Sequence, residues 1–160
     1  MKAFWTILFL LLLLSQSSFA NPCQEFQEIP FNSQKFERCK SVAQAGDRDS
    51  EFGYGLWLIS GPDEVRNYSE GLVWVRKAAF NKQPYAQVYL AVALSREEFP
   101  AEYRDLVEAY AWFATVNPHP KNSDLTKLEK NMTDEQILQA KELAKTFQEK
   151  YTSETSIMGE

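Results

Sequence analysis

The chain has 160 residues, a formal net charge of -5 and no long run of charges of one sign. This charge disfavours nucleic acid and anionic membrane surfaces as partners, because both select clustered lysine and arginine. Hydrophobic residues make up 44% of the chain and aromatic residues 14%, which argues against disorder and predicts a packed interior. A chain of this length is expected to form about one domain.

The first 20 residues are typical of a secretory signal peptide. Lys2 supplies the positive start, residues 3–14 are apolar, and Ser18 and Ala20 suit signal peptidase. The alternative is a membrane anchor, but an apolar run of about 12 residues falls short of the roughly 20 that cross a bilayer as a helix. We therefore predict that residues 1–20 are removed and that the rest is periplasmic or secreted, without membrane insertion.

Both cysteines, Cys23 and Cys39, lie just after the predicted cleavage point. An export signal implies an oxidising compartment, in which an even number of cysteines usually pairs. A redox or metal role is the weaker interpretation, because catalytic thiols favour closer spacing and a metal site needs more ligands than two cysteines and one histidine. We predict a structural Cys23–Cys39 disulfide.

Two stretches of the chain repeat one helical pattern. The sequence SEFGYG at residues 50–55 returns as AQVYLA at residues 86–91, and SEGLVWVRKAAF at residues 69–80 returns as LVEAYAWFATV at residues 106–116. Self-similarity at a fixed period predicts stacked structural units, since one helical hairpin cannot bury its apolar stripe alone.

The repeat predicts two full units, at about residues 48–82 and 84–116, with a half-unit before them. Apolar residues recur at helical spacing in each half of a unit, and turn residues separate the halves, so each unit is expected to be a helix pair. Small residues let neighbouring helix backbones approach, and a tryptophan one turn later fills the adjoining space. The predicted core positions are Gly55, Ala91, Ala109, Trp74 and Trp112.

These motifs resemble the Sel-one-like repeat family, relatives of the tetratricopeptide repeat. The sequence WVRKAA at residues 74–79 fits the end of the family pattern, and Asp105, Ala109 and Trp112 fit it in the second unit. The departures are Ser50, Asn67 and Ala91, where the pattern has alanine, aspartate and glycine. The resemblance implies an all-α fold, a short α-solenoid of antiparallel helix pairs.

The C-terminal part is expected to cap the solenoid. Residues 117–124 are predicted to be a loop, and Thr133 with Gln136 forms a capping box at the start of a helix over about 134–150. With this helix the folded domain covers residues 21–151. The tail at residues 152–160 has no pattern and is predicted to be disordered.

Candidate catalytic groups are few. One histidine is too few for a hydrolytic metal site, and the chain lacks the S-x-x-K motif of β-lactam-hydrolysing enzymes. We expect no catalytic residue, metal or cofactor. A β-lactam-hydrolysing or penicillin-binding enzyme, suggested by cysteine-rich relatives, is the least favoured hypothesis.

The remaining hypothesis is a protein-binding module, because stacked repeats present a groove lined by the first helix of each pair. The positions left free by the packing pattern are Glu51 and Gln87, Tyr89, and Val92 with its counterpart Leu56. Tyr89 stands where the other unit has Gly53, so it is either unit-specific packing or a contact anchor. The resemblance implies an adaptor or assembly factor for an envelope protein, or an immunity protein that neutralises a toxic effector.

Overall fold

The computed structural model describes Cys23 and residues 32–117 and 123–152, and within these residues all regular structure is helical. This confirms the predicted all-α class. The predicted signal peptide and the tail beyond Thr152 lie outside the described residues. In chain order the elements are α2 (Ser33–Gln44), α3 (Arg48–Ser60), α4 (Tyr68–Phe80), α5 (Pro84–Ser95), the 3-10 turn η1 (Ala101–Tyr103), α6 (Leu106–Val116), α7 (Ser123–Glu129) and α8 (Asp134–Tyr151).

Polar side chains fix where the helices begin. An N-cap side chain accepts a hydrogen bond from the backbone N–H three residues further on, which satisfies one of the free donors of the first turn. At α8 the bond is reciprocal, because Gln136 also accepts from the Thr133 N–H at 2.9 Å, which confirms the predicted capping box. The N-caps are Asn32, Asp47, Asn67, Gln83, Asp105 and Thr133.

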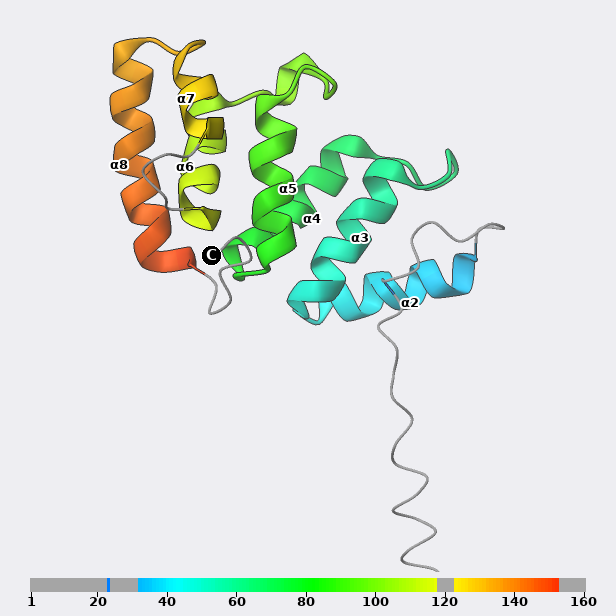
Figure 1. Cartoon of the computed structure of the whole chain (residues 1–160). Helices are drawn as coiled ribbons and strands as arrows, with labels where there is room; N and C mark the ends of the chain where they lie inside the picture. The colour runs from blue at the N-terminus through cyan, green and yellow to red at the C-terminus, as the bar shows by residue number, and fades with distance from the viewer. Residues whose placement is uncertain (1–22, 24–31, 118–122, 153–160) are drawn as a thin grey trace, which may run out of the picture.

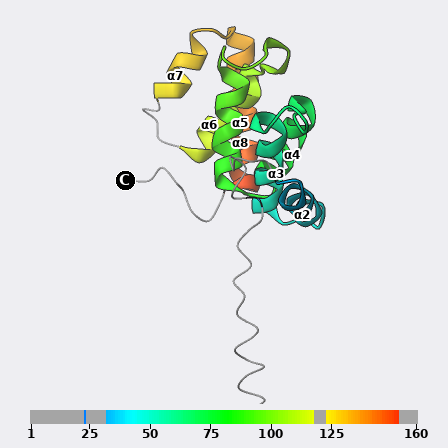
Figure 2. The ribbon, with the colours of Figure 1, turned by 90° about the vertical axis from the view of Figure 1, so that its right-hand side faces the viewer.

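The helices stack in sequence order. Each helix from α2 to α6 packs against the next one, and α8 packs along α6 (Figure 1). In the view of Figure 2, α7 stands to one side of α5, α6 and α8. This arrangement confirms the predicted α-solenoid with a capping helix. Units 48–82 and 84–116 correspond to the pairs α3–α4 and α5–α6.

The buried side chains form two clusters. The larger cluster joins α4, α5, α6 and α8, and its fully buried members include Leu90 and Trp112. The smaller cluster joins Cys23 to α2 and α3 and contains Trp57, which has no exposed surface. The hydrophobic effect therefore stabilises the molecule through two adjoining cores, one at its N-terminal end and one in the rest of the stack.

Glycine allows the closest helix approach in the stack. A Cβ added to Gly55 would come within 2.9 Å of the Gly71 carbonyl oxygen, and a Cβ added to Gly71 would lie 2.8 Å from the Gly55 oxygen. In the second pair, Ala91 and Ala109 are fully buried at the corresponding positions. Small residues at these positions let the helix axes come close.

Two sequence-based expectations differ from the structure. Trp74 is only half-buried, whereas Trp112 is fully buried, because α8 and Phe80 cover Trp112 and no such helix lies over Trp74 in the described residues. The second difference concerns the loop predicted at residues 117–124. Its last two residues belong to α7, a short helix that the polar sequence did not predict and whose Leu128 reaches the core.

Candidate functional site

Glu51, one of the predicted binding residues, has no exposed surface. Its carboxylate accepts a hydrogen bond from the Asn81 amide at 2.7 Å and pairs with the Lys77 ammonium at 2.9 Å. A charge this buried must be compensated by such partners. The prediction that Glu51 is free to bind a partner is therefore wrong, since it joins α3 to the end of α4.

Gln87 occupies the equivalent position in the second unit and is buried too, with 1% of its surface exposed. Its amide donates to the Ala79 carbonyl at 3.1 Å and to the Tyr151 carbonyl at 2.7 Å, so it holds the end of α8 against α5. The binding role predicted for Gln87 is also wrong. Glu51 and Gln87 are polar residues at equivalent positions of the two repeat units. This agreement could have indicated that both have a structural function.

Tyr89 and Val92 remain partly exposed on α5. The Tyr89 ring lies 6.2 Å from Phe52 of α3 and 6.0 Å from Phe99, in edge-to-face contacts. Burial raises the pKa of the Tyr89 phenol from its ordinary value of 10 to about 12, so its hydroxyl stays protonated at pH values where an exposed tyrosine ionises. Tyr89 thus packs on one side and keeps surface on the other.

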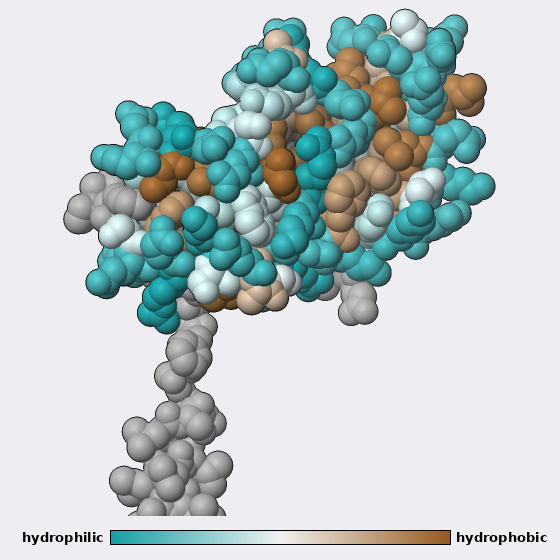
Figure 3. All heavy atoms as spheres, turned by 180° about the vertical axis from the view of Figure 1, so that it is seen from behind, coloured by the Kyte–Doolittle hydropathy of each residue, from teal (hydrophilic) through white to brown (hydrophobic). Residues whose placement is uncertain are grey.

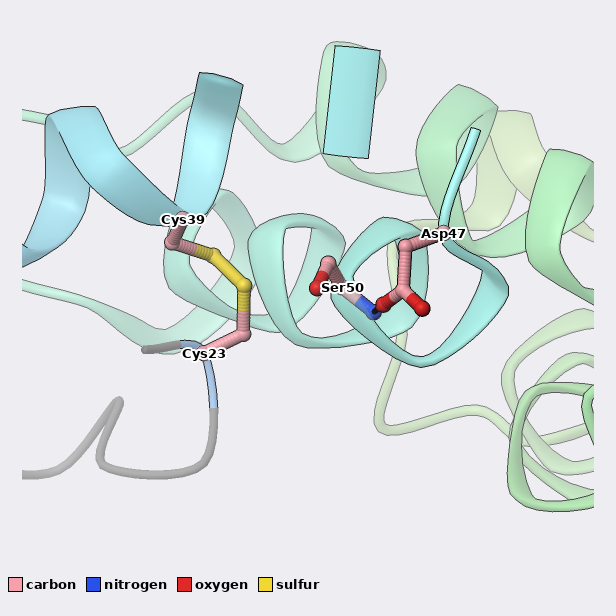
Figure 4. The surroundings of a disulfide bond; sticks show 4 residues. All are labelled: Cys23, Cys39, Asp47 and Ser50. Carbon is pink, nitrogen blue, oxygen red and sulfur yellow. Dashed lines mark hydrogen bonds between the residues drawn. A yellow bond between two sulfur atoms is a disulfide. The ribbon is translucent and has the colours of Figure 1, made fainter. Parts of the chain in front are cut away.

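The glycine that replaces Tyr89 in the first unit is explained by the disulfide. Cys23 and Cys39 form the predicted bond, with their Cα atoms 4.9 Å apart (Figure 4). A Cβ on Gly53 would lie 2.8 Å from the Cys23 carbonyl oxygen, so Cys23 occupies the space that a side chain would fill. Tyr89 has no such covering segment among the described residues.

A set of partly or fully exposed apolar residues on α3 and α5, which meet where the Phe52 ring lies 6.2 Å from Tyr89, is here called the α3/α5 face. Tyr85, which is 61% exposed, shares one side of α5 with Tyr89 and Val92 through its spacing of four and seven residues. Phe52 and Leu56 stand one turn apart on α3 and are half-buried. The sequence interpretation missed Tyr85, although this spacing could have indicated it. The α3/α5 face consists of Phe52, Leu56, Tyr85, Tyr89 and Val92.

Aromatic contacts extend from Tyr89 to the turn between α5 and α6. The Tyr68 ring lies 6.2 Å from Phe99 and 5.0 Å from Tyr103. Burial, with smaller contributions from Tyr89, Tyr103 and Glu102, raises the Tyr68 pKa to about 12. Its hydroxyl is buried and has no hydrogen-bond partner in the described part of the chain.

Beside this group, a pocket of about 300 Å³ opens between α4 and the turn that leads into α6. Leu72, Val73 and Tyr103 supply apolar lining, and Arg76 and Glu102 supply polar lining. The Arg76 guanidinium is held at 3.0 and 2.8 Å by both carboxylate oxygens of Glu108, and this hydrogen-bonded pair raises the Arg76 pKa. The pair also ties α4 to α6.

Comparison with known proteins identifies the architecture. No protein-family model matches the chain, and no curated protein does. A solved structure that matches is a protective antigen present in uropathogenic Escherichia coli strains, described as displaying an SLR fold, that is, a Sel-one-like repeat fold. The TM-score is 0.60 at 29% sequence identity, over 74% of this chain and 26% of that one. The chain therefore spans about a quarter of the length of that protein.

This chain has the Sel-one-like repeat fold.

The Sel-one-like repeat fold is a scaffold of a kind that generally mediates contacts between proteins. The surface seen in Figure 3 fits such a use, because hydrophobic patches interrupt a largely hydrophilic surface. Within the described residues, no group of three histidine, cysteine or acidic side chains is placed to hold a metal ion. Nor is any described helix long and apolar enough to cross a membrane.

Proposed function

We propose that this Sel-one-like repeat protein is an exported adaptor or assembly factor that binds another envelope protein through the α3/α5 face. The observation that carries the proposal is that the first helices of two stacked hairpins present Tyr85, Tyr89 and Val92 beside Phe52 and Leu56 on one partly exposed face. Aromatic side chains with an apolar body and a polar tip are the residues that most often anchor protein interfaces.

Export is supported by two features. The first 20 residues have the pattern of a cleaved signal peptide. The Cys23–Cys39 disulfide fits an oxidising compartment, where such bonds persist. The Sel-one-like repeat fold and the small number of candidate catalytic side chains support a non-enzymatic function.

Capture from an envelope extract tests the α3/α5 face. The bait is the immobilised protein, compared with Tyr89→Ala and with the double variant Tyr85→Ser, Val92→Ser, each first shown to be folded by circular dichroism. The control is Leu138→Ser on α8, which removes an apolar side chain that is 63% exposed, close to the 61% of Tyr85. We expect the same partner band with parent and control and its loss with the face variants. Equal capture by all four proteins would remove this face from consideration.

The second candidate is an immunity protein that neutralises a toxic effector. The acidic side chains that surround the pocket beside α4 favour it, because they would speed association with a basic protein. Protection of cells by this chain against a toxin encoded beside its gene would support this candidate. Hydrolysis of a chromogenic β-lactam above the buffer rate would instead overturn the non-enzymatic proposal.

A further inference from the structure

Two segments that connect the helices along one edge of the stack concentrate the acidic charge of the described chain. Residues 61–70 and 96–108 meet where the rings of Tyr68 and Tyr103 lie 5.0 Å apart. Together they carry eight acidic and three basic side chains, whereas the other described residues carry ten acidic and twelve basic ones. Among the described residues, the negative potential is therefore local to these two segments.

The pocket beside α4 lies between these two acidic segments and combines apolar lining with carboxylates. Leu72 is buried in its lining, and Val73, with 61% of its surface exposed, stands beside it. Glu108 already neutralises Arg76, and Asp105 caps α6 by accepting the Glu108 N–H at 2.9 Å, while Glu102 forms no ion pair with any described basic residue. The pocket thus places two carboxylates, those of Glu102 and Asp105, next to aliphatic surface.

We propose that this pocket and the acidic turns around it bind a basic segment of the protein partner, one lysine or arginine of which enters the pocket. The inference rests on the proposed function, because it names the chemistry of the partner of the same module. The aliphatic stem packs against Leu72 and Val73 while the cationic head reaches Glu102 and Asp105. The Tyr103 ring gives a guanidinium a face to stack on.

The size of the pocket fits one long side chain rather than a small-molecule cofactor. A volume of about 300 Å³ is at the lower limit of ligand sites, and its mixed lining suits an occupant that is apolar along its length and charged at its tip. Arg104 also lines the pocket, and its guanidinium is paired with Glu97 at 3.9 Å. An acidic occupant would instead meet the Glu102 and Asp105 carboxylates.

The test is an NMR titration of the ¹⁵N-labelled protein with an end-blocked peptide, Gly-Lys-Leu-Arg-Lys-Gly. We expect amide shifts confined to residues 69–76 and 102–105, and none with the counterpart Gly-Glu-Leu-Glu-Glu-Gly. Val73→Lys should weaken binding about tenfold, since it puts a like charge beside the pocket, while Val73→Glu should retain it. Glu102→Gln should weaken it about threefold. Glu149→Gln, an exposed acidic change on α8, is the control.

Shifts spread over all acidic residues, equal response to both peptides, no response at all, or equal effects of Val73→Lys and Val73→Glu would each overturn the inference. The capture experiment separates this failure from failure of the proposed function. If capture depends on Tyr89 and Val92 but not on Val73→Lys, the module binds its partner without the pocket. If capture is lost only with Val73→Lys, the α3/α5 face is wrong and the pocket stands.

Discussion

The first hairpin, α3 with α4, and the second, α5 with α6, share one sequence pattern but differ where their helices touch. In the first, Gly55 and Gly71 face each other, and each would place a Cβ within 2.9 Å of the other's carbonyl oxygen. In the second, Ala91 and Ala109 fill the same positions with no exposed surface. The pattern thus specifies that a small residue is needed, and the local helix separation decides how small.

The hairpins also differ in what covers them at each end of the stack. Cys23 lies over Gly53 in the first hairpin, whereas the corresponding Tyr89 keeps exposed surface. Conversely, α8 covers Trp112, with the Phe147 ring 4.5 Å away, while Trp74 stays half-buried against Tyr54 and beneath the Lys77 ammonium. In a solenoid each repeat contacts only its neighbours, so equivalent residues acquire different environments at the two ends.

Truncating the two tryptophans should have the largest effect on stability and should differ most between the hairpins. Trp112→Ala should lower the free energy of unfolding by about 3 to 5 kcal/mol, because it empties a fully enclosed site in the larger core. Trp74→Ala should cost clearly less, since part of its surface already faces water. Urea unfolding followed by circular dichroism measures both. Equal losses would show that the two tryptophans are equivalent core residues after all.

Removing the disulfide should have the next largest effect. Cys23→Ser with Cys39→Ser opens a loop with a sequence separation of 16, for which the chain-entropy estimate is about 3 kcal/mol. The loss should be centred on α2 and α3, because Cys23 belongs to the smaller cluster with these two helices. Hydrogen exchange should therefore accelerate in α2 and α3 before α6 and α8. Uniform acceleration across all helices would contradict this localisation.

The sequence predicted the fold more fully than the candidate site. The repeat pattern, the capping box at Thr133 and the disulfide are signals set by local spacing or by cysteine number, so they could be interpreted before any contact was known. The half-buried state of Trp74 depends on which helix lies over it, and that is a tertiary property. The helix α7 was missed because its short, polar sequence is stabilised through Leu128 in the core.

The binding residues were harder to predict, because the repeat pattern does not determine whether the side chain at a given position is exposed. Glu51 and Gln87 are polar residues in first helices, and polarity suggested free surface. In the structure both satisfy backbone or side-chain groups across the stack, which only the contacts reveal. Tyr85, by contrast, could have been predicted from its helical spacing to Tyr89 and Val92.

Exchanging the small residues between the hairpins should lower the stability of the protein moderately. Gly55→Ala should destabilise by about 1 to 3 kcal/mol, because its Cβ would crowd Val75 and the Gly71 oxygen. Ala91→Gly should cost about 1 kcal/mol, through the conformational freedom of glycine in a helix interior. Thermal unfolding of both variants measures the order. A Gly55→Ala variant more stable than the parent would show that α3 and α4 can separate without cost.

Alkaline pH should produce the smallest and most gradual effect, with contributions from both hairpins. Burial raises the pKa of Tyr54 in α3 and of Tyr89 in α5 to about 12, above the ordinary value of 10. Between these two values the unfolded chain loses phenol protons that the folded chain retains, so the free energy of unfolding should fall as pH rises from about 10 to 12. Below pH 10 these groups contribute no pH dependence. Tyr54→Phe and Tyr89→Phe should each make the fall shallower in urea unfolding at a series of pH values. If neither variant alters the slope, other alkaline groups control this window and the buried phenols do not distinguish the hairpins.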